Sequence, residues 1–265
     1  MKQLVFFLAL ALALPFDAQS QTRDRLDNRG KLFGFEAVGR LDSPSGRCTA
    51  ALIARDVVLT AAHCVHEAKG PFTFRAAYSD GEALAVRDVV DVVIAGAYVR
   101  AKARNDRGGE IANDVALLRL ASPINDHGID PYAIAPSPGV GTPLTLASYG
   151  RGRTEALTLE RNCAMRQVYS DGILGMNCST TFGSSGAPVF YQSSGRLWII
   201  SVVSSRVFTA DIDGRTLGTN LRTTVPVLLQ TLRNRASAPK ISSGARRLTV
   251  GDRTETGARF LRPDD

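Results

Sequence analysis

Short apolar runs separated by turn residues constrain the fold of this chain more than any other feature of its sequence. In the body of the chain, residues 21–232, a turn signal recurs roughly every 8–15 residues, and the runs between the signals are rich in Val, Leu and Ile. This pattern predicts an all-β protein of the antiparallel sandwich or barrel type and argues against βαβ units. The runs are Ala50–Ile53, Val57–Leu59, Val89–Ile94, Val115–Leu120, Pro143–Leu146, Val189–Tyr191 and Leu197–Val203.

Only the end of the body has a convincing helical period. Its apolar residues recur at i, i+3, i+4 and i+7, which predicts a C-terminal helix over 225–233 with Pro226 in its first turn. The segment Ala101–Asn113 is polar and charged and is interpreted as a loop, while 121–142, with four prolines, is interpreted as the crossover between two halves of the body. The helical positions are Val225, Leu228, Leu229 and Leu232.

The first 20 residues are typical of an export signal. A lysine near the start precedes the apolar run Leu4–Leu14, and Ala18 and Ser20 form a small-x-small cleavage site. We therefore expect residues 1–20 to be removed as a signal peptide and the mature protein, starting at Gln21, to be secreted or periplasmic. The apolar run has 11 residues. A bilayer-spanning helix needs ~20, so no membrane span is expected after cleavage.

The positive charge of the chain is concentrated at its C-terminus. The formal net charge is +7, and residues 233–265 hold eight basic and four acidic side chains, which gives +4. The body carries the remaining +3, because Lys2 and Asp17 cancel within the signal segment. The tail 233–265 is rich in Ser, Gly and Arg, which predicts a flexible segment. A solvated end is favoured over contact with anionic surfaces, and no nucleic-acid partner is expected.

An exported chain of this size has room for a substantial core and is expected to form disulfides. Removal of the signal leaves 265 − 20 = 245 residues, and the whole chain is 44% hydrophobic. This length suits one large all-β domain or two small ones. The four cysteines are expected to form two disulfides in an oxidising compartment, with three pairings open.

Three short segments carry side chains suited to nucleophilic catalysis. A serine hydroxyl is a weak nucleophile at neutral pH unless a base removes its proton as it attacks. Histidine, whose ordinary pKa is near ~6.5, can accept that proton and return it to a leaving group, and a carboxylate can orient the imidazole. The segments are Leu59–Cys64 (LTAAHC), Asn113–Leu120 (NDVALLRL) and Gly183–Pro188 (GSSGAP).

In this order, the three segments resemble the T-A-A-H-C, D-[IV]-A-L-[LI]-x-L and G-x-S-G-x-P hallmarks of the chymotrypsin/trypsin superfamily of serine peptidases. The resemblance covers roughly residues 35–232 and implies two antiparallel six-stranded β-barrels with the active site between them. It implies an endopeptidase acting on proteins or peptides, with Ser185 as nucleophile, His63 as general base and Asp114 as the acid that orients it. The backbone N–H groups of Gly183 and Ser185 would form the oxyanion hole.

The disulfide pairing also follows from the resemblance. Cys48 and Cys64 match the family's disulfide beside the catalytic histidine, which locks the histidine loop onto the preceding strand. Cys163 and Cys178 are then the second pair and close a loop that leads to the nucleophile.

Two positions depart from trypsin. Ser184 stands where trypsins carry the acid that pairs with a newly exposed N-terminal amine, so we expect maturation without that ion-pair switch. Ser179 stands at the floor of the specificity pocket where trypsin-like enzymes carry Asp, so a preference for Lys or Arg at P1 is not expected. The GSSGAP form looks more like bacterial secreted members, including the glutamyl-endopeptidase branch.

The remaining pocket residues leave the P1 preference open. Thr180, Ser204 and Arg206 resemble the pocket wall and the strand edge to which substrate backbone pairs. Arg206 either binds an acidic P1 side chain through charge-assisted hydrogen bonds or points to solvent. The glutamyl branch usually has a histidine where this chain has Val203. Cleavage after large apolar, small or acidic residues is compatible with these positions.

Two other functions are conceivable on the same scaffold. A catalytically silent binding protein would keep the fold, and a serine-directed reagent distinguishes it. A protease–chaperone needs a peptide-binding module after the protease body, which the 33 residues of 233–265 are too few to form. The sequence has no metal-ligand spacing, phosphate loop or nucleotide fingerprint, so no metal and no cofactor are expected, and the protein is expected to act as a monomer.

Overall fold

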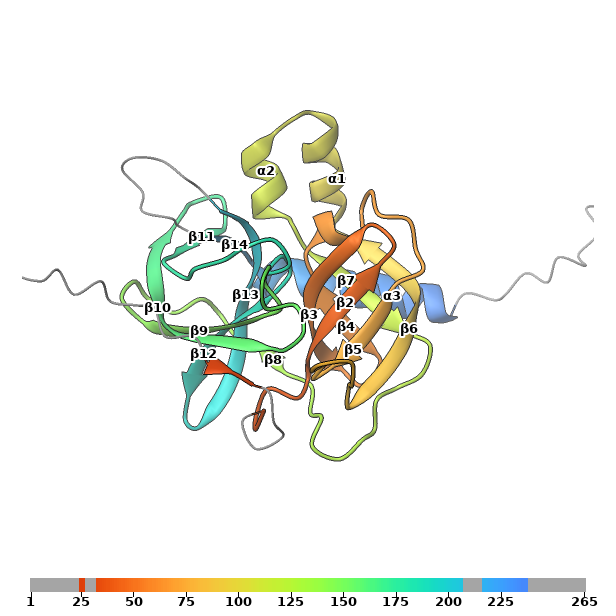
Figure 1. Ribbon diagram of the computed structural model, residues 1–265. Coiled ribbons are helices and arrows are strands. Elements are labelled where there is room, and N and C mark those ends of the chain that lie inside the picture. Colours follow the sequence, from red (N-terminus) through yellow and green to blue (C-terminus); the bar gives the residue numbers. More distant parts are fainter. Residues whose placement is uncertain (1–23, 27–31, 207–215, 238–265) are drawn as a thin grey trace, which may run out of the picture.

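Two β-barrels lie side by side in the computed structural model, joined by an extended crossover (Figure 1). The structure describes residues 24–26, 32–206 and 216–237. The predicted signal peptide 1–20 and residues 238–265 of the predicted tail lie outside the described residues. The two antiparallel six-stranded barrels and the C-terminal helix predicted from the sequence are confirmed.

The first barrel is a closed ring of six antiparallel strands in the order β2-β3-β4-β7-β6-β5. β3 and β4 form its best buried wall, since Ala50–Leu52 and Val57–Leu59 are buried. β5 alternates between half-buried and buried side chains, and most of β6 alternates between exposed and half-buried ones, as strands with one solvent-facing side do. The strands are β2 (Val38–Ser43), β3 (Gly46–Ala54), β4 (Val57–Thr60), β5 (Thr73–Ala76), β6 (Ala85–Ile94) and β7 (Ala116–Leu120).

The second barrel closes through the pairing of β9 with β10, which completes the ring β9-β10-β11-β14-β13-β12. Two short strands join it from outside: β1 (Asp24–Arg25) pairs with β10, and β8 (Ala133–Ile134), within the crossover, pairs in parallel with β13. The ring strands are β9 (Pro143–Ser148), β10 (Thr158–Val168), β11 (Ile173–Met176), β12 (Pro188–Ser193), β13 (Arg196–Arg206) and β14 (Thr216–Asn220).

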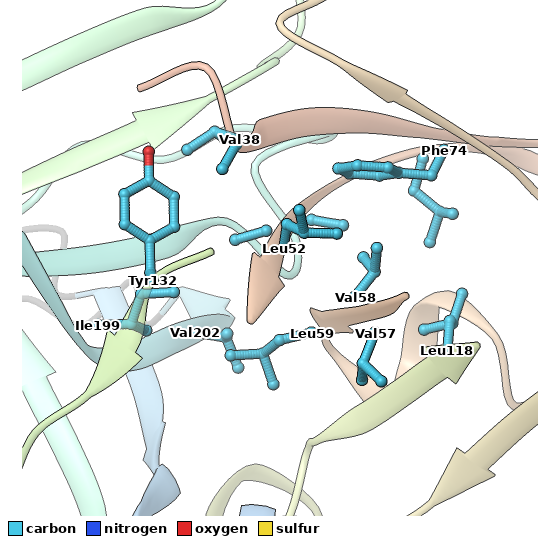
Figure 2. Packing of buried hydrophobic residues seen from close by; sticks show 14 of the residues in the cluster. Val38, Leu52, Val57, Val58, Leu59, Phe74, Leu118, Tyr132, Ile199 and Val202 are labelled. Carbon is cyan, nitrogen blue, oxygen red and sulfur yellow. The ribbon is translucent and has the colours of Figure 1, made fainter. Parts of the chain in front are cut away.

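The hydrophobic core of the first barrel continues across the junction into the second. Figure 2 shows Leu52, Val58 and Phe74 of the first barrel in one packed cluster with Ile199 and Val202 of β13. A second cluster, inside the second barrel, includes both cysteines of the second disulfide, and a small third cluster joins Ile111 to Ile173 and Leu217. A shared core of this kind makes the relative position of the two barrels part of the fold.

A polar cluster also fastens the barrels to each other. The buried guanidinium of Arg40 pairs with Asp42 at 2.8 Å and donates to the Thr154 carbonyl of the second barrel at 3.1 Å. It lies 3.6 Å from the centroid of the Tyr78 ring, whose hydroxyl donates to Glu155 at 2.6 Å. That hydrogen bond, with the Arg40 charge, lowers the pKa of Glu155. Glu155 therefore stays ionised, and this bridge between the barrels persists, to lower pH than for an ordinary glutamate.

The segment interpreted as a loop, Ala101–Asn113, is largely helical, and this interpretation was wrong. α1 (Gly96–Ala103) and α2 (Arg107–Ala112) form a short helical pair that lies above the junction of the barrels (Figure 1). The two adjacent glycines lower helix propensity, but Asp106 caps α2 by accepting from the Gly109 N–H at 3.0 Å. Burial of Tyr98 and Ile111 supplies the packing that local propensity lacks.

The C-terminal helix, α3 (Leu221–Ser237), is longer at both ends than the predicted 225–233. It takes in residues 233–237, which were assigned to the tail, because Arg235 binds Asp91 at 2.9 Å and holds the last turn on the first barrel. Pro226 lies in the second turn and not in the first. No helix within the described residues is long and apolar enough to cross a membrane.

Candidate active site

His63 lies in η1 (Ala62–Cys64), a single 3-10 turn that directly follows the buried strand β4. The next residue, Cys64, is bonded to Cys48 of β3, with the two Cα atoms 6.3 Å apart. The imidazole is therefore held between a buried strand and a covalent link, while 35% of its side chain remains exposed to solvent. Cys48, His63 and Cys64 bring potential metal-ligand atoms together, but both sulfurs are used in the disulfide and offer no thiolate.

Asp114 precedes β7 and is 2% exposed. Its carboxylate accepts three hydrogen bonds: from the His63 backbone N–H at 2.9 Å, from His63 Nδ1 at 2.6 Å and from the Ser204 hydroxyl at 2.6 Å. An ionised carboxylate can only accept, so Nδ1 carries the proton and Nε2 is left as the basic nitrogen. Because Ser204 belongs to β13, this network joins the two barrels.

The serine-bearing loop, residues 182–186, is fixed against the first barrel by Thr49 of β3. The Thr49 N–H donates to the Ser185 carbonyl at 2.9 Å, and its hydroxyl donates to the Gly183 carbonyl at 2.8 Å. The same hydroxyl oxygen accepts from the Tyr149 N–H at 3.0 Å. Gly183 has φ +88°, and a Cβ there would collide with the Tyr149 carbonyl, so this position requires glycine.

Ser185 and His63 line the same cleft, together with Gly183 and the Cys48–Cys64 disulfide. The cleft has a volume of about 560 Å³ and opens at the junction of the barrels. The three residues His63, Asp114 and Ser185, which the sequence places far apart, are thus brought to one place in the fold. The structure gives the His63–Asp114 contact directly and places Ser185 with His63 on the wall of one cleft.

A buried glutamate that the sequence analysis missed supports the residues before the nucleophile. Glu160 of β10 is 2% exposed, and both its carboxylate oxygens accept from the Ser179 N–H, at 3.0 and 2.9 Å. The Cys163–Cys178 disulfide ties the same strand to the residue before Ser179. No sequence motif marks Glu160. Its contact with the Ser179 N–H arises only when β10 folds beside the segment that leads to the nucleophile.

The residues assigned to the specificity pocket make two separate sets of hydrogen bonds. Arg206 Nη1 donates to the Thr180 carbonyl at 3.0 Å, and Thr180 is buried with its hydroxyl 3.0 Å from that of Thr216. Ser179, next in the chain to Thr180, is held by Glu160. Ser204, by contrast, directs its hydroxyl to Asp114. The segment 207–215 that follows Arg206 lies outside the described residues.

Helices α1 and α2 enclose the Asp114 side of the site. Tyr98 of α1 is buried, and burial, with a contribution from the Asp114 charge, raises its pKa to about 12. The phenol is therefore neutral across the pH range in which a histidine titrates. α2 reaches the second barrel, since the Thr219 hydroxyl donates to the Ile111 carbonyl at 2.7 Å.

Ser184 is fully buried and held by neutral hydrogen bonds. Its hydroxyl donates to the Ser148 hydroxyl at 3.2 Å and accepts from the Thr181 N–H at 3.3 Å. This arrangement needs no cation, whereas a buried carboxylate at this position would need one. The loop therefore has local support that is independent of a free N-terminal amine.

We expect a chain that begins at Gln21 and one extended by a few residues at the same end to have equal peptidase activity, within about threefold. An enzyme that depends on a buried ion pair with its N-terminus would lose about 3–5 kcal/mol when that pair is broken, which corresponds to a ~160- to 5,000-fold loss of activity if it falls on the transition state. The measurement is kcat/KM of both forms, with N-terminal sequencing after the assay. Activity that arises only after trimming to one particular residue would contradict this expectation.

Two six-stranded antiparallel barrels with a His–Asp pair and a serine at their junction define the chymotrypsin-like class of protein. Residues 32–211 match the protein-family model described as Trypsin, and the chain belongs to the trypsin family. The match covers most of both barrels.

Individual relatives agree with this assignment. The glutamyl endopeptidase of Bacillus licheniformis is 28% identical over 199 residues, which cover 74% of this chain and 61% of that protein. This chain therefore spans about 61% of the length of that relative. A solved structure, described as a thermostable serine protease from an extremophilic microorganism, aligns with a TM-score of 0.58 at 20% identity, covering 77% of this chain and 98% of that one. At this identity the solved structure supports the fold alone.

Proposed function

We propose that this protein is an exported serine endopeptidase in which Ser185 is the nucleophile, His63 the general base and Asp114 the orienting carboxylate. The observation that carries the proposal is the 2.6 Å contact between His63 Nδ1 and the buried Asp114, with His63 on the wall of a cleft that Ser185 also lines. The contact holds the imidazole in the tautomer whose Nε2 is free to accept a proton. Membership of the trypsin family supports the same assignment.

In the proposed reaction, Nε2 of His63 takes the proton of the Ser185 hydroxyl as its oxygen adds to the scissile carbonyl. Asp114 stabilises the imidazolium that forms, and its two other hydrogen bonds keep the carboxylate in place. The imidazolium then gives the proton to the leaving amine as the C–N bond breaks, which leaves an ester on Ser185. Water, deprotonated by the same imidazole, hydrolyses that ester and regenerates the serine.

The geometry of the nucleophile loop supports an oxyanion hole at Gly183 and Ser185. The Phe182 carbonyl accepts from the Arg151 N–H at 2.6 Å. In a trans peptide the carbonyl and the next N–H point in opposite directions, so the Gly183 N–H is directed away from Arg151 N. In the same manner, the Ser184 carbonyl accepts from Ala187 at 3.0 Å, which turns the Ser185 N–H away from the protein interior. Two preorganised donors of this kind typically contribute ~10²–10³-fold each to the rate.

For the acyl side of the substrate, we propose pairing with the β13 edge at Ser204–Arg206 and an acidic P1 side chain. Arg206 places its guanidinium against Thr180, the pocket residue next to Ser179. A cation in the pocket wall and the absence of an aspartate at position 179 both disfavour lysine and arginine at P1. The name of the Bacillus relative, a glutamyl endopeptidase, supports the same preference.

Export is part of the proposal because the two disulfides require an oxidising compartment. The N-terminal 20 residues have the pattern of a signal peptide. Secretion to the medium or retention in the periplasm both provide such conditions.

A serine-directed fluorophosphonate is expected to label the purified chain once, on Ser185. The reagent reacts quickly only with a serine that a neighbouring base activates, so the test separates an active peptidase from a silent binding protein on the same scaffold. Intact-mass and peptide mass spectrometry give the stoichiometry and the position. Heat-unfolded protein serves as the control and should not react. A folded protein that resists the reagent would support the binding-protein alternative.

A further inference from the structure

A groove continues from the cleft of His63 and Ser185 along the side of the site where the Cys48–Cys64 disulfide lies. One part of it contains His63, Ser185 and the disulfide, and the other extends to Asp42 and Thr154. The two parts meet at a common set of residues, so a bound chain can pass from one to the other. We call the whole the disulfide-side groove, and its shared residues are Ser43, Gly46, Arg47, Arg151, Phe182 and Gly183.

The disulfide-side groove is on the leaving-group side of the proposed nucleophile. None of the pocket residues Thr180, Ser204 and Arg206 lines it, and the Ser204 hydroxyl is directed to the buried Asp114. The acyl part of a substrate, which the β13 edge would hold, therefore lies away from the groove. His63 must pass its proton to the leaving amine, so the segment after the scissile bond extends from His63 into the disulfide-side groove.

Arg151 and Phe182 form an unusual pair at the centre of this groove. The Phe182 ring is 75% exposed, directly before Gly183, although aromatic rings of this size are normally covered. The Arg151 guanidinium lies 4.4 Å from its centroid, and the two residues are also joined by the Arg151 N–H to Phe182 carbonyl bond. The attraction between the guanidinium charge and the face of the ring favours this position of the Arg151 side chain beside Phe182.

The charges around the groove leave these arginines without a strong internal partner. Within the described part of the chain, no carboxylate lies within 4.0 Å of the Arg151 guanidinium. Arg47 has only long contacts, 3.8 Å to Asp42 and 3.7 Å to Glu155. Asp42 is already bound by Arg40 and by Arg75, at 2.8 and 2.9 Å. Among the described residues, the two guanidinium groups therefore have at most these long contacts to carboxylates; the other carboxylate that lines the groove, Glu67, lies 4.0 Å from Lys102.

We propose that Arg151, held on the Phe182 ring, and Arg47 form a subsite that selects an acidic side chain within the first two residues after the scissile bond. This inference rests on the proposed function and specifies the substrate class on its leaving side. A carboxylate in the groove gains charge-assisted, bidentate hydrogen bonds from guanidinium groups that are already oriented. A lysine or arginine at the same place meets like charge and is rejected.

The test is acyl transfer, which measures binding on the leaving side alone. The purified protein is acylated with a peptide ester, and the dipeptide amides Ala-Asp-NH₂, Asp-Ala-NH₂ and Ala-Lys-NH₂ compete with water for the acyl-enzyme. The ratio of aminolysis to hydrolysis, read by mass spectrometry, is expected to be about five- to tenfold higher for the better aspartyl nucleophile than for the lysyl one. The preference should shrink in 0.5 M salt, because exposed charges are screened.

Variants separate the subsite from the net charge of the protein. Arg151→Glu is expected to reverse the preference, Arg47→Gln to weaken it and Arg151→Lys to keep part of it, since lysine retains the charge but not the planar stacking. Arg166→Glu, an exposed site on β10 outside the groove, makes the same charge change and should leave the ratio as in the wild type. Equal ratios for aspartyl and lysyl nucleophiles, or the same shift from Arg151→Glu and Arg166→Glu, would overturn the inference.

Failure of the proposed function has a different signature. In that case the wild-type protein does not hydrolyse the ester at all, and no acyl-enzyme forms on Ser185. If the ester is hydrolysed and the acyl group is transferred without preference for acidic nucleophiles, the peptidase assignment stands and only the subsite is rejected.

Discussion

Ser185→Ala is expected to lower kcat/KM for peptide substrates by about 10³- to 10⁶-fold, with the fold retained. Alanine has no hydroxyl to add to the carbonyl, so only the oxyanion hole and substrate binding remain to accelerate attack by water. The fold should persist because Thr49 is bonded to the backbone carbonyl of Ser185 and not to its side chain. Initial rates on a peptide substrate measure the loss, and circular dichroism with a thermal melt checks the fold.

The neighbouring serine provides a matched control. Ser184→Ala removes a hydroxyl one position away, whose hydrogen bonds are to Ser148 and Thr181. Loss of these bonds is expected to cost about 1 kcal/mol of stability and to leave kcat/KM within about tenfold of the wild type. Turnover by Ser185→Ala above about 1% of wild type would assign the nucleophile to another group.

Asp114→Asn is expected to lower kcat by about 10⁴-fold, the size of loss that the same change causes in a well-characterised Ser-His-Asp triad. The carboxylate accepts three hydrogen bonds, and an amide cannot replace both of its oxygens as acceptors. If the amide NH₂ group faces His63, the imidazole adopts the tautomer in which Nε2 is protonated and cannot act as a base. Single-turnover kinetics measure the acylation step directly.

Ser204→Ala tests whether this loss comes from the imidazole or from general disruption of the network. It removes one of the three donors to Asp114 and leaves both bonds to His63. We expect kcat of Ser204→Ala to fall by about tenfold. A hydrogen bond to a charged group contributes about 1.5–3 kcal/mol, and a water molecule bound to Asp114 in place of the hydroxyl restores part of that contribution. Equal losses in Asp114→Asn and Ser204→Ala, or a loss below tenfold in Asp114→Asn, would contradict the role assigned to the carboxylate.

Most of the barrel strands could be predicted because their apolar runs are local. All seven runs identified in the sequence correspond to strands, β3, β4, β6, β7, β9, β12 and β13, with Val115 alone lying just before its strand. The strands without such a run include β2 and β10, which carry the buried charges of Arg40 and Glu160. A charged residue interrupts an apolar pattern, and the contacts that cover it include distant segments, at Thr154 for Arg40 and at Ser179 for Glu160. The two strands are therefore visible only in the folded molecule.

The candidate site also contains residues that could be predicted from the sequence and residues that could not. The proposed triad residues His63, Asp114 and Ser185 each lie in a local motif, so they could be put forward from the sequence together with Gly183. Thr49 and Glu160 could not be predicted, because each is hydrogen-bonded to the backbone of a segment distant in the sequence. Thr49 is bonded to the Gly183 carbonyl and Glu160 to the Ser179 N–H. The α1–α2 pair was missed for a related reason: its stability comes from packing on the barrels and not from helix propensity.

The hydrogen bonds of Thr49 have a mechanical consequence. Many two-domain proteins bind a ligand by hinge closure, in which the two domains rotate toward each other around it. Here one residue of the first half holds the Ser185 and Gly183 carbonyls and the Tyr149 amide of the second. A swing of even a few degrees at that point would stretch these bonds and distort the loop that must stay in register with His63. We therefore expect the two barrels to keep the same relative position when substrate binds, so that any adaptation comes from side chains and surface loops.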